Sequence, residues 1–214
     1  MSKMRLETSL KRAFSELGID SEQQTGIMMF LGVLLMKGDA WKPTYEHCIR
    51  VGLLARAIGK FMGMDEKALF YAGILHDVGK CLTDHIVLSK TQSWGPDDAR
   101  EMETHVHDGF RLLRGKFDFS AEILKWHHQF QGNSYPKELP APLHPFSKGT
   151  EVTISMYGRL LALADSYDAL HRVNFQDGKV RKLSRDEIRK KMLERNPHQK
   201  VLVENLYTAG ILEK

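Results

Sequence analysis

Cysteine is scarce in this sequence, with only Cys48 and Cys81 among 214 residues. Two irregularly placed cysteines cannot form the disulfide framework of a small secreted domain, so the sequence favours a reducing cytoplasm. The first residues are soon followed by charged and polar side chains, so we expect no secretory signal. The longest apolar run, from Gly26 to Met36, is shorter than the roughly 20 residues that cross a bilayer. We therefore expect a buried helix there and no membrane partner.

A large excess of charge is also missing. The chain is 42% hydrophobic and 27% charged, which is typical of a globular protein. Its formal net charge of +4 and its pI of about 9.0 favour anionic ligands such as phosphates. Most of the late basic residues lie between Arg181 and Arg195, and we interpret them as a solvated helix face rather than a polyanion-binding patch. The sequence thus gives no strong signal for nucleic-acid binding.

Strand-like alternation and internal repeats are absent from the sequence, whereas helical periodicity recurs along it. Two segments rich in loop-forming residues, 78–95 and 129–150, are expected to be loops. Ser184 and Glu187 form a capping-box pattern that predicts a helix start. We expect helices over about 6–17, 21–37, 44–61, 65–75, 97–113, 120–128 and 152–170, then after Ser184 and over 201–211. The predicted fold class is all-α.

His76 and Asp77 place two kinds of metal ligand in one turn of backbone, at the end of an apolar helix-like segment. An imidazole binds one ion, while a neighbouring carboxylate can bridge that ion to a second. Further His and Asp residues fall on or at the ends of expected helices, so several helices could point ligands into one central site. The candidate ligands are His47, His76, Asp77, His105, His127, His128 and Asp165.

A single His in a helix is more often a core or surface residue than a ligand, so each candidate also has a purely structural interpretation. A purely structural interpretation is hardest to accept for Asp165, because an isolated carboxylate directly after the apolar run 160–164 would be costly to bury. Cys48 and Cys81 are interpreted as packing residues. Imidazole and carboxylate together suit Fe, Mn, Co, Ni or Zn rather than Ca. The histidines interpreted as non-ligands are His85, His107, His144, His171 and His198.

The ordered set of motifs resembles the HD superfamily of metal-dependent phosphohydrolases, and more closely its HD-GYP branch. The matching segments are HCIRV (47–51), HDVGK (76–80), LSK (88–90), METH (102–105) with Gly109, HH (127–128) and ADSYDAL (164–170). The resemblance covers about residues 43–175. Each motif alone is moderately specific at best, whereas the complete series in this order is highly specific.

The resemblance implies an HD-domain helical bundle with a central metal site that binds two divalent transition-metal ions, with Fe or Mn favoured over Ni, Co or Zn. Asp77 would bridge the two ions and, with Lys80, would be catalytic. The implied ligands are His47, His76 and Asp165 for the first metal, and His105, His127 and His128 for the second. The implied substrate-binding residues are Lys80, Lys90, Tyr135 and Arg172.

The chain departs from the HD-GYP pattern in three places. The loop after the paired histidines keeps Tyr135 and Pro136, but Gln131 replaces the acidic residue, Ser134 replaces the second glycine, and the loop is one residue shorter. Pro43 stands where some members place a third-metal glutamate, so we expect two metals. Arg172 comes earlier than the usual arginine of the branch.

The implied function is a phosphodiesterase of cyclic di-GMP or a related nucleotide, in which a metal-bridging hydroxide attacks phosphorus. One alternative is a nucleotide phosphomonoesterase or a di-iron oxygenase, and another is a non-catalytic HD-type interaction module. Lys80 favours phosphate chemistry because a cation suits an anionic substrate, and the complete ligand set favours an enzyme. The helical extensions, residues 1–42 and 176–214, either cap the core or take part in a homodimer contact.

Overall fold

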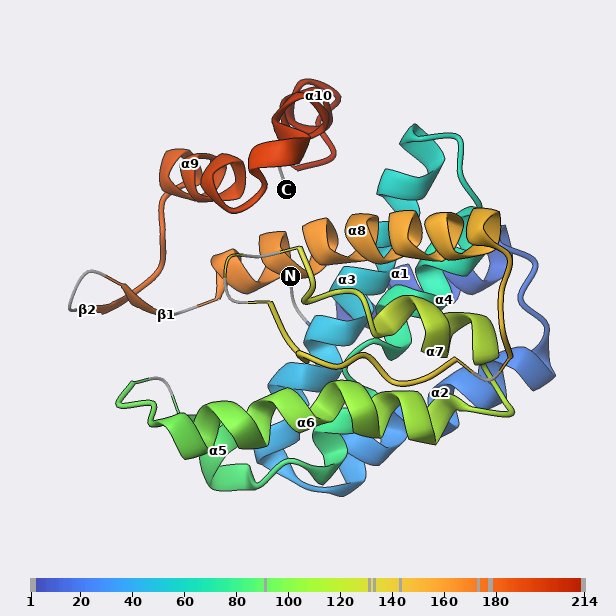
Figure 1. The fold of residues 1–214 in the computed structure, drawn as a ribbon, viewed down its shortest axis with the longest axis horizontal. Coiled ribbons are helices and arrows are strands. Elements are labelled where there is room, and N and C mark those ends of the chain that lie inside the picture. Colours follow the sequence, from blue (N-terminus) through green and yellow to red (C-terminus); the bar gives the residue numbers. More distant parts are fainter. Residues whose placement is uncertain are drawn as a thin grey trace.

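The chain is helical along most of its length (Figure 1). A computed structural model describes residues 3–90, 92–130, 132, 134–142, 144–172, 174–176 and 179–212. The helices are α1 (Lys3–Glu16), α2 (Ser21–Met36), α3 (Lys42–Phe61), α4 (Glu66–Leu75), α5 (His85–Ser89), α6 (Pro96–Leu113), α7 (Asp118–Leu124), α8 (Lys148–His171), α9 (Arg185–Arg195) and α10 (Lys200–Thr208). Short 3-10 turns are η1 (Asp39–Trp41), η2 (Val78–Leu82) and η3 (Pro197–Gln199).

The helix boundaries follow from local capping. Asp65 accepts hydrogen bonds from the backbone N–H groups of Lys67 and Ala68, which fixes the start of α4. Ser184 and Glu187 make the predicted reciprocal capping box at the start of α9. Asp20, one residue before the expected start, caps α2. The all-α prediction is confirmed.

Two local predictions were wrong. Residues 78–95, expected to be a loop, contain η2 and the five-residue helix α5, which Asp84 caps by accepting from the N–H of Ile86. A two-stranded antiparallel hairpin, β1 (Asn174–Gln176) with β2 (Lys179–Arg181), follows α8. Elements of three to five residues are too short to show a periodicity in sequence.

Helices α3 and α4 form the centre of the bundle because glycines let their backbones approach closely. A Cβ atom on Gly73 would lie 2.8 Å from the Cα atom of Gly52, and one on Gly52 would lie 3.0 Å from the Cβ atom of Ile74. The close crossing brings the second turn of α3 near the C-terminal end of α4. His47 and His76 lie at these two places.

Two apolar clusters flank this central pair of helices. The first joins α1, α2 and α6 to α3 and α4, and its members include Leu10 and Phe14 from the N-terminal extension. The second joins α7 and α8 to α9 and α10 through buried residues such as Met192 and Leu206. Both extensions therefore pack against the core (Figure 1). No helix among the described residues is long and apolar enough to span a membrane.

Candidate metal centre

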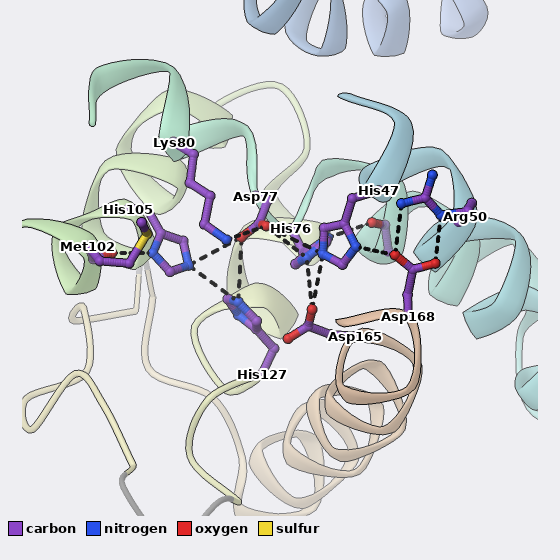
Figure 2. A network of polar contacts seen from close by, with 11 residues as sticks. His47, Arg50, His76, Asp77, Lys80, Met102, His105, His127, Asp165 and Asp168 are labelled. Atoms are coloured by element: carbon purple, nitrogen blue, oxygen red, sulfur yellow. Dashed lines mark hydrogen bonds and ion pairs between the residues drawn. The ribbon is translucent and has the colours of Figure 1, made fainter. Parts of the chain in front are cut away.

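The seven residues predicted as ligands converge on one buried site, although they come from five separate parts of the chain. Figure 2 labels six of them, all except His128. Helix α3 contributes the first histidine, and the end of α4 with the next residue contributes the His-Asp pair. Helix α6, the turn after α7 and helix α8 contribute the rest. The residues are His47, His76, Asp77, His105, His127, His128 and Asp165.

The donor atoms form two groups, and within each group they lie within 4.8 Å of one another. One group is His47, His76 and Asp165, and the other is Asp77, His105, His127 and His128. The division is the one that the family resemblance implies for two metal ions. The distances between donor atoms within each group also fit one ion per group, because ligands that surround a single cation lie about this far apart.

Asp77 connects the two groups through its two oxygen atoms. Its Oδ2 lies 3.3 Å from His76 Nε2 and 3.6 Å from His47 Nε2. Its Oδ1 lies 3.3 Å from His105 Nε2 and 3.9 Å from His127 Nε2. A carboxylate with one oxygen toward each group has the orientation of a bridging ligand.

Backbone carbonyls orient three of the histidines. His76 Nδ1 donates to the carbonyl of Gly73 at 2.8 Å, and His105 Nδ1 donates to that of Met102 at 2.5 Å. His127 Nδ1 donates to the carbonyl at position 124 in the same way. A carbonyl can only accept, so the hydrogen sits on Nδ1, and whenever the imidazole is neutral its lone pair sits on Nε2. Each Nε2 points into the site.

His47 is oriented by an ion pair that the sequence did not reveal. Its Nδ1 lies 2.7 Å from Asp168 Oδ2, and the same carboxylate receives Arg50 Nε at 2.7 Å and Arg50 Nη2 at 3.0 Å (Figure 2). Burial opposes ionisation of Asp168, but hydrogen bonds from His47 and Arg50 hold its pKa well below the usual range. The ionised carboxylate fixes Nδ1 as the protonated nitrogen. The spacing of Asp165 and Asp168 on one helix face was the signal that could have identified this role.

We predict that Asp168→Asn weakens metal binding by roughly 10- to 100-fold, because a neutral amide no longer enforces the tautomer and orientation of His47. Titration of metal-free protein with Mn²⁺ measures the change. Asp97→Asn is the matched control, since Asp97 is an exposed carboxylate that pairs with Arg100 on α6. Equal affinity of the Asp168 variant and this control would contradict the orienting role.

The two groups differ in their protonation. Burial opposes a charge on His76, but the negative charges of the nearby Asp77 and Asp165 carboxylates raise its pKa to about 10. Burial and the charge of Lys80 lower the pKa of His105 to about 3. Burial and the charge of His76 lower the pKa of His127 to about 4. His76 therefore binds a proton readily, whereas His105 and His127 are neutral at neutral pH and keep lone pairs available to a cation.

Several polar atoms in the site lack the hydrogen bonds that burial normally requires. Within the described part of the chain, Nε2 of His47, His76 and His128 and Oδ1 of Asp77 have no partner of hydrogen-bond geometry. The N···O approach of 3.1 Å between His47 and Asp165 is an ion-pair contact without that geometry. Buried polar atoms are rarely left unsatisfied, so these atoms fit cation ligands better than structural residues. The nitrogen and oxygen donors suit divalent transition metals.

The predicted substrate-binding residues line one cleft, and two of them contact the metal centre. Lys80 Nζ lies 2.5 Å from Asp77 Oδ2, and the ring of Tyr135 stacks on His128 with centroids 4.2 Å apart. Lys90 is paired with Asp98 at 2.6 Å. A cleft of about 1880 Å³ is lined by all four predicted residues, Lys80, Lys90, Tyr135 and Arg172, and also reaches His128 and Asp165. Positions 131 and 133, on which the loop departures partly rest, lie outside the described residues.

Comparison with known proteins identifies the family. The family model described as "HD domain" matches residues 44–170, and the chain belongs to this family. The resemblance to the HD superfamily, predicted from the motifs, is confirmed. The fold is also similar to the HD domain of a phosphodiesterase, PgpH, from L. monocytogenes, with a TM-score of 0.50, 18% identity and 86% of each chain covered.

Curated relatives include a cyclic di-GMP phosphodiesterase of Thermotoga maritima, which is 34% identical over 135 residues. That alignment covers 59% of this chain and 34% of the relative. A 3′3′-cGAMP-specific phosphodiesterase of Vibrio cholerae is 24% identical over 160 residues, covering 70% of this chain and 35% of the relative. The chain thus spans about a third of the length of these proteins.

Proposed function

We propose that this chain is a metal-dependent phosphodiesterase that hydrolyses a cyclic dinucleotide, such as cyclic di-GMP or a related molecule. The observation that carries the proposal is the pair of donor groups joined by Asp77, whose two oxygens face different groups. The relatives named above act on cyclic dinucleotides, which supports the substrate class.

In the proposed site, His47, His76 and Asp165 would hold one ion, His105, His127 and His128 would hold the other, and Asp77 would offer one oxygen to each. Fe or Mn suits this mixed set of imidazoles and carboxylates, with Ni, Co or Zn as alternatives. When bound, the ions would supply the Lewis acidity that activates water and neutralises charge on a phosphoryl oxygen. The Nδ1 contacts of His47, His76 and His105 turn their Nε2 atoms toward the positions that the ions would occupy.

The side chains around the metal centre bind and orient the substrate. Lys80 Nζ, already beside the bridging carboxylate, donates to a phosphate oxygen that gains charge during the reaction. Tyr135 covers one face of His128 and keeps solvent from that ring. The cleft accommodates an anion, because basic side chains such as Arg172 and Lys182 outnumber acidic ones among its lining residues.

A metal-reconstituted activity screen tests the proposal. Protein loaded with Mn²⁺ or Fe²⁺ is incubated with cyclic dinucleotides, linear dinucleotides and mononucleotides, and the products are separated by chromatography. We expect two metals per chain and conversion of a cyclic dinucleotide to its linear form. Two-metal protein that cleaves only phosphomonoesters would support the monoesterase alternative, and no hydrolysis at all would sink the proposal.

We predict that Lys80→Ala lowers kcat by roughly 100- to 1000-fold, because it removes a cation aimed at the developing charge. The metal content should stay at the wild-type value, since Lys80 is not among the seven donors. Steady-state kinetics and elemental analysis measure the two quantities on one sample. Lys116→Ala, a change at an exposed lysine beyond the cleft, is the control. Loss of metal in the Lys80 variant would instead assign this residue a structural role.

A further inference from the structure

The three tryptophans of the chain have different surroundings. Trp41 is buried, and its Nε1 donates to the carbonyl of Lys80 at 2.8 Å. Trp126 is half-buried and its ring stacks on Phe130. Trp94 is 44% exposed, and it lines the same cleft as Lys80. A partly exposed indole that lines a candidate active-site cleft offers a flat aromatic face to a ligand.

The loop that carries Trp94 is held in place by several polar contacts. The indole Nε1 donates to the carbonyl of Lys90 at 3.3 Å. The ammonium of Lys90 lies 2.6 Å from both carboxylate oxygens of Asp98, and Gly95 N donates to the same carboxylate at 2.8 Å. Ser93 has a φ of 60°, in the left-handed region that non-glycine residues rarely adopt. These contacts present the indole in a defined position at the edge of the cleft.

The surroundings of Trp94 suit a ligand that is both flat and anionic. Within the described part of the chain, no other aromatic ring or cation stacks on its indole face. The cleft runs from Trp94 to His128, Tyr135 and Asp165 and carries the basic side chains noted above. The loop before α6 and the β1–β2 hairpin lie at the same end of the molecule (Figure 1). Lys182, which follows the hairpin in the sequence, also lines the cleft. A nucleotide combines a planar base with a phosphate.

We propose that Trp94 is a stacking face for a nucleobase of the substrate, and that it favours nucleotides over phosphate compounds that have no base. The inference rests on the proposed function and deepens it. Stacking on an aromatic side chain tolerates any base, because every base has a π-face. Trp94 therefore contributes affinity for nucleotides as a class and does not choose between guanine and adenine.

Kinetics of two substitutions test the stacking role. Trp94→Ala should raise KM roughly 5- to 100-fold for cyclic dinucleotides with either guanine or adenine bases, with kcat within about twofold of wild type. Inhibition by inorganic phosphate should be unchanged, and Trp94→Phe should restore most of the affinity. Phe119→Ala is the matched control, since Phe119 is 45% exposed and lies outside the cleft residues. An unchanged KM in Trp94→Ala, or an equal loss of phosphate inhibition, would overturn the inference.

A binding measurement separates this inference from the proposed reaction. GMP added to metal-reconstituted protein should quench tryptophan fluorescence, inorganic phosphate should not, and Trp94→Phe should remove the quench. If the protein hydrolyses no phosphodiester but shows this Trp94-dependent quench, the reaction is wrong and the nucleobase site stands. If hydrolysis is normal but no quench depends on Trp94, the reaction stands and the stacking face is refuted.

Discussion

Asp77→Asn is expected to lower hydrolysis of a cyclic dinucleotide more than a thousandfold, beyond the roughly 100- to 1000-fold cost of losing one electrostatic contact. Asp77 is 1% exposed and faces both donor groups, so its replacement changes both proposed metal sites at once. Asparagine keeps the shape but loses the charge, and its NH₂ group must face one of the two groups. A metal ion held by that group would then face an N–H donor, although it needs an oxygen lone pair.

Metal content and activity must be measured together for this variant. We expect the metal bound per chain to fall from two toward one, while circular dichroism shows that the helices remain. Asp97→Asn, the exposed-carboxylate control, should keep both metals and full activity. A fully active Asp77→Asn protein that retains two metals would exclude the bridging role of Asp77. It would also exclude a mechanism in which one carboxylate is shared by the two ions.

The seven converging residues were predictable because their motifs occur in a fixed order and each sits on or beside an expected helix. Their orientation was not. His47 is held by Asp168, which is 121 positions away in the sequence, and Arg50 completes the same ion pair. Such a contact depends on how α3 crosses α8, and helical periodicity gives the buried face of each helix without the crossing. The i, i+3 spacing from Asp165 to Asp168 was the available local signal.

The loop before α6 shows a second limit of the sequence. The motif that contains Lys90 predicts a substrate contact, and it gives no sign of the ion pair between the Lys90 ammonium and Asp98 that the structure shows. Turn geometry and competition between nearby carboxylates decide such pairs, and neither leaves a periodic pattern. The hairpin after α8 is similar: its strands are three residues each, and only Asp177-Gly178 between them is a recognisable turn signal in the sequence.

The docking of the extensions could be predicted least. Helix α2 is apolar on most of its faces, so its sequence predicts burial but does not select a neighbour. In the structure, Leu31 and Leu34 are buried in the first apolar cluster, whereas Met29 and Met36 are exposed. The residues of the metal centre are constrained by chemistry, while those of α2 are constrained only by shape, and shape is not visible in a single sequence.

Gly79→Ala is the second change with a large expected effect, because η2 lies directly against the backbone of α6. A Cβ atom on Gly79 would lie 2.0 Å from the carbonyl oxygen of His105 and 2.5 Å from the backbone nitrogen of Gly109. Real Cβ contacts are never so short, and both neighbours are backbone atoms that cannot rotate away. Either η2 or α6 must shift, and such overpacking typically costs roughly 1–3 kcal/mol, occasionally more.

The shift would also disturb the metal centre, because η2 directly follows Asp77 and includes Lys80, while α6 carries His105. We therefore expect Gly79→Ala to lower the free energy of unfolding and the metal affinity together. Urea denaturation of metal-free protein isolates the first effect, and metal titration of the folded fraction measures the second. Gly32→Ala is the control: nothing lies within 4 Å of its added Cβ, and alanine favours a helix by up to about 1 kcal/mol. If both variants unfold at the same urea concentration, η2 cannot rest on α6 at the observed distance, and the relative placement of Asp77 and His105 would need another explanation.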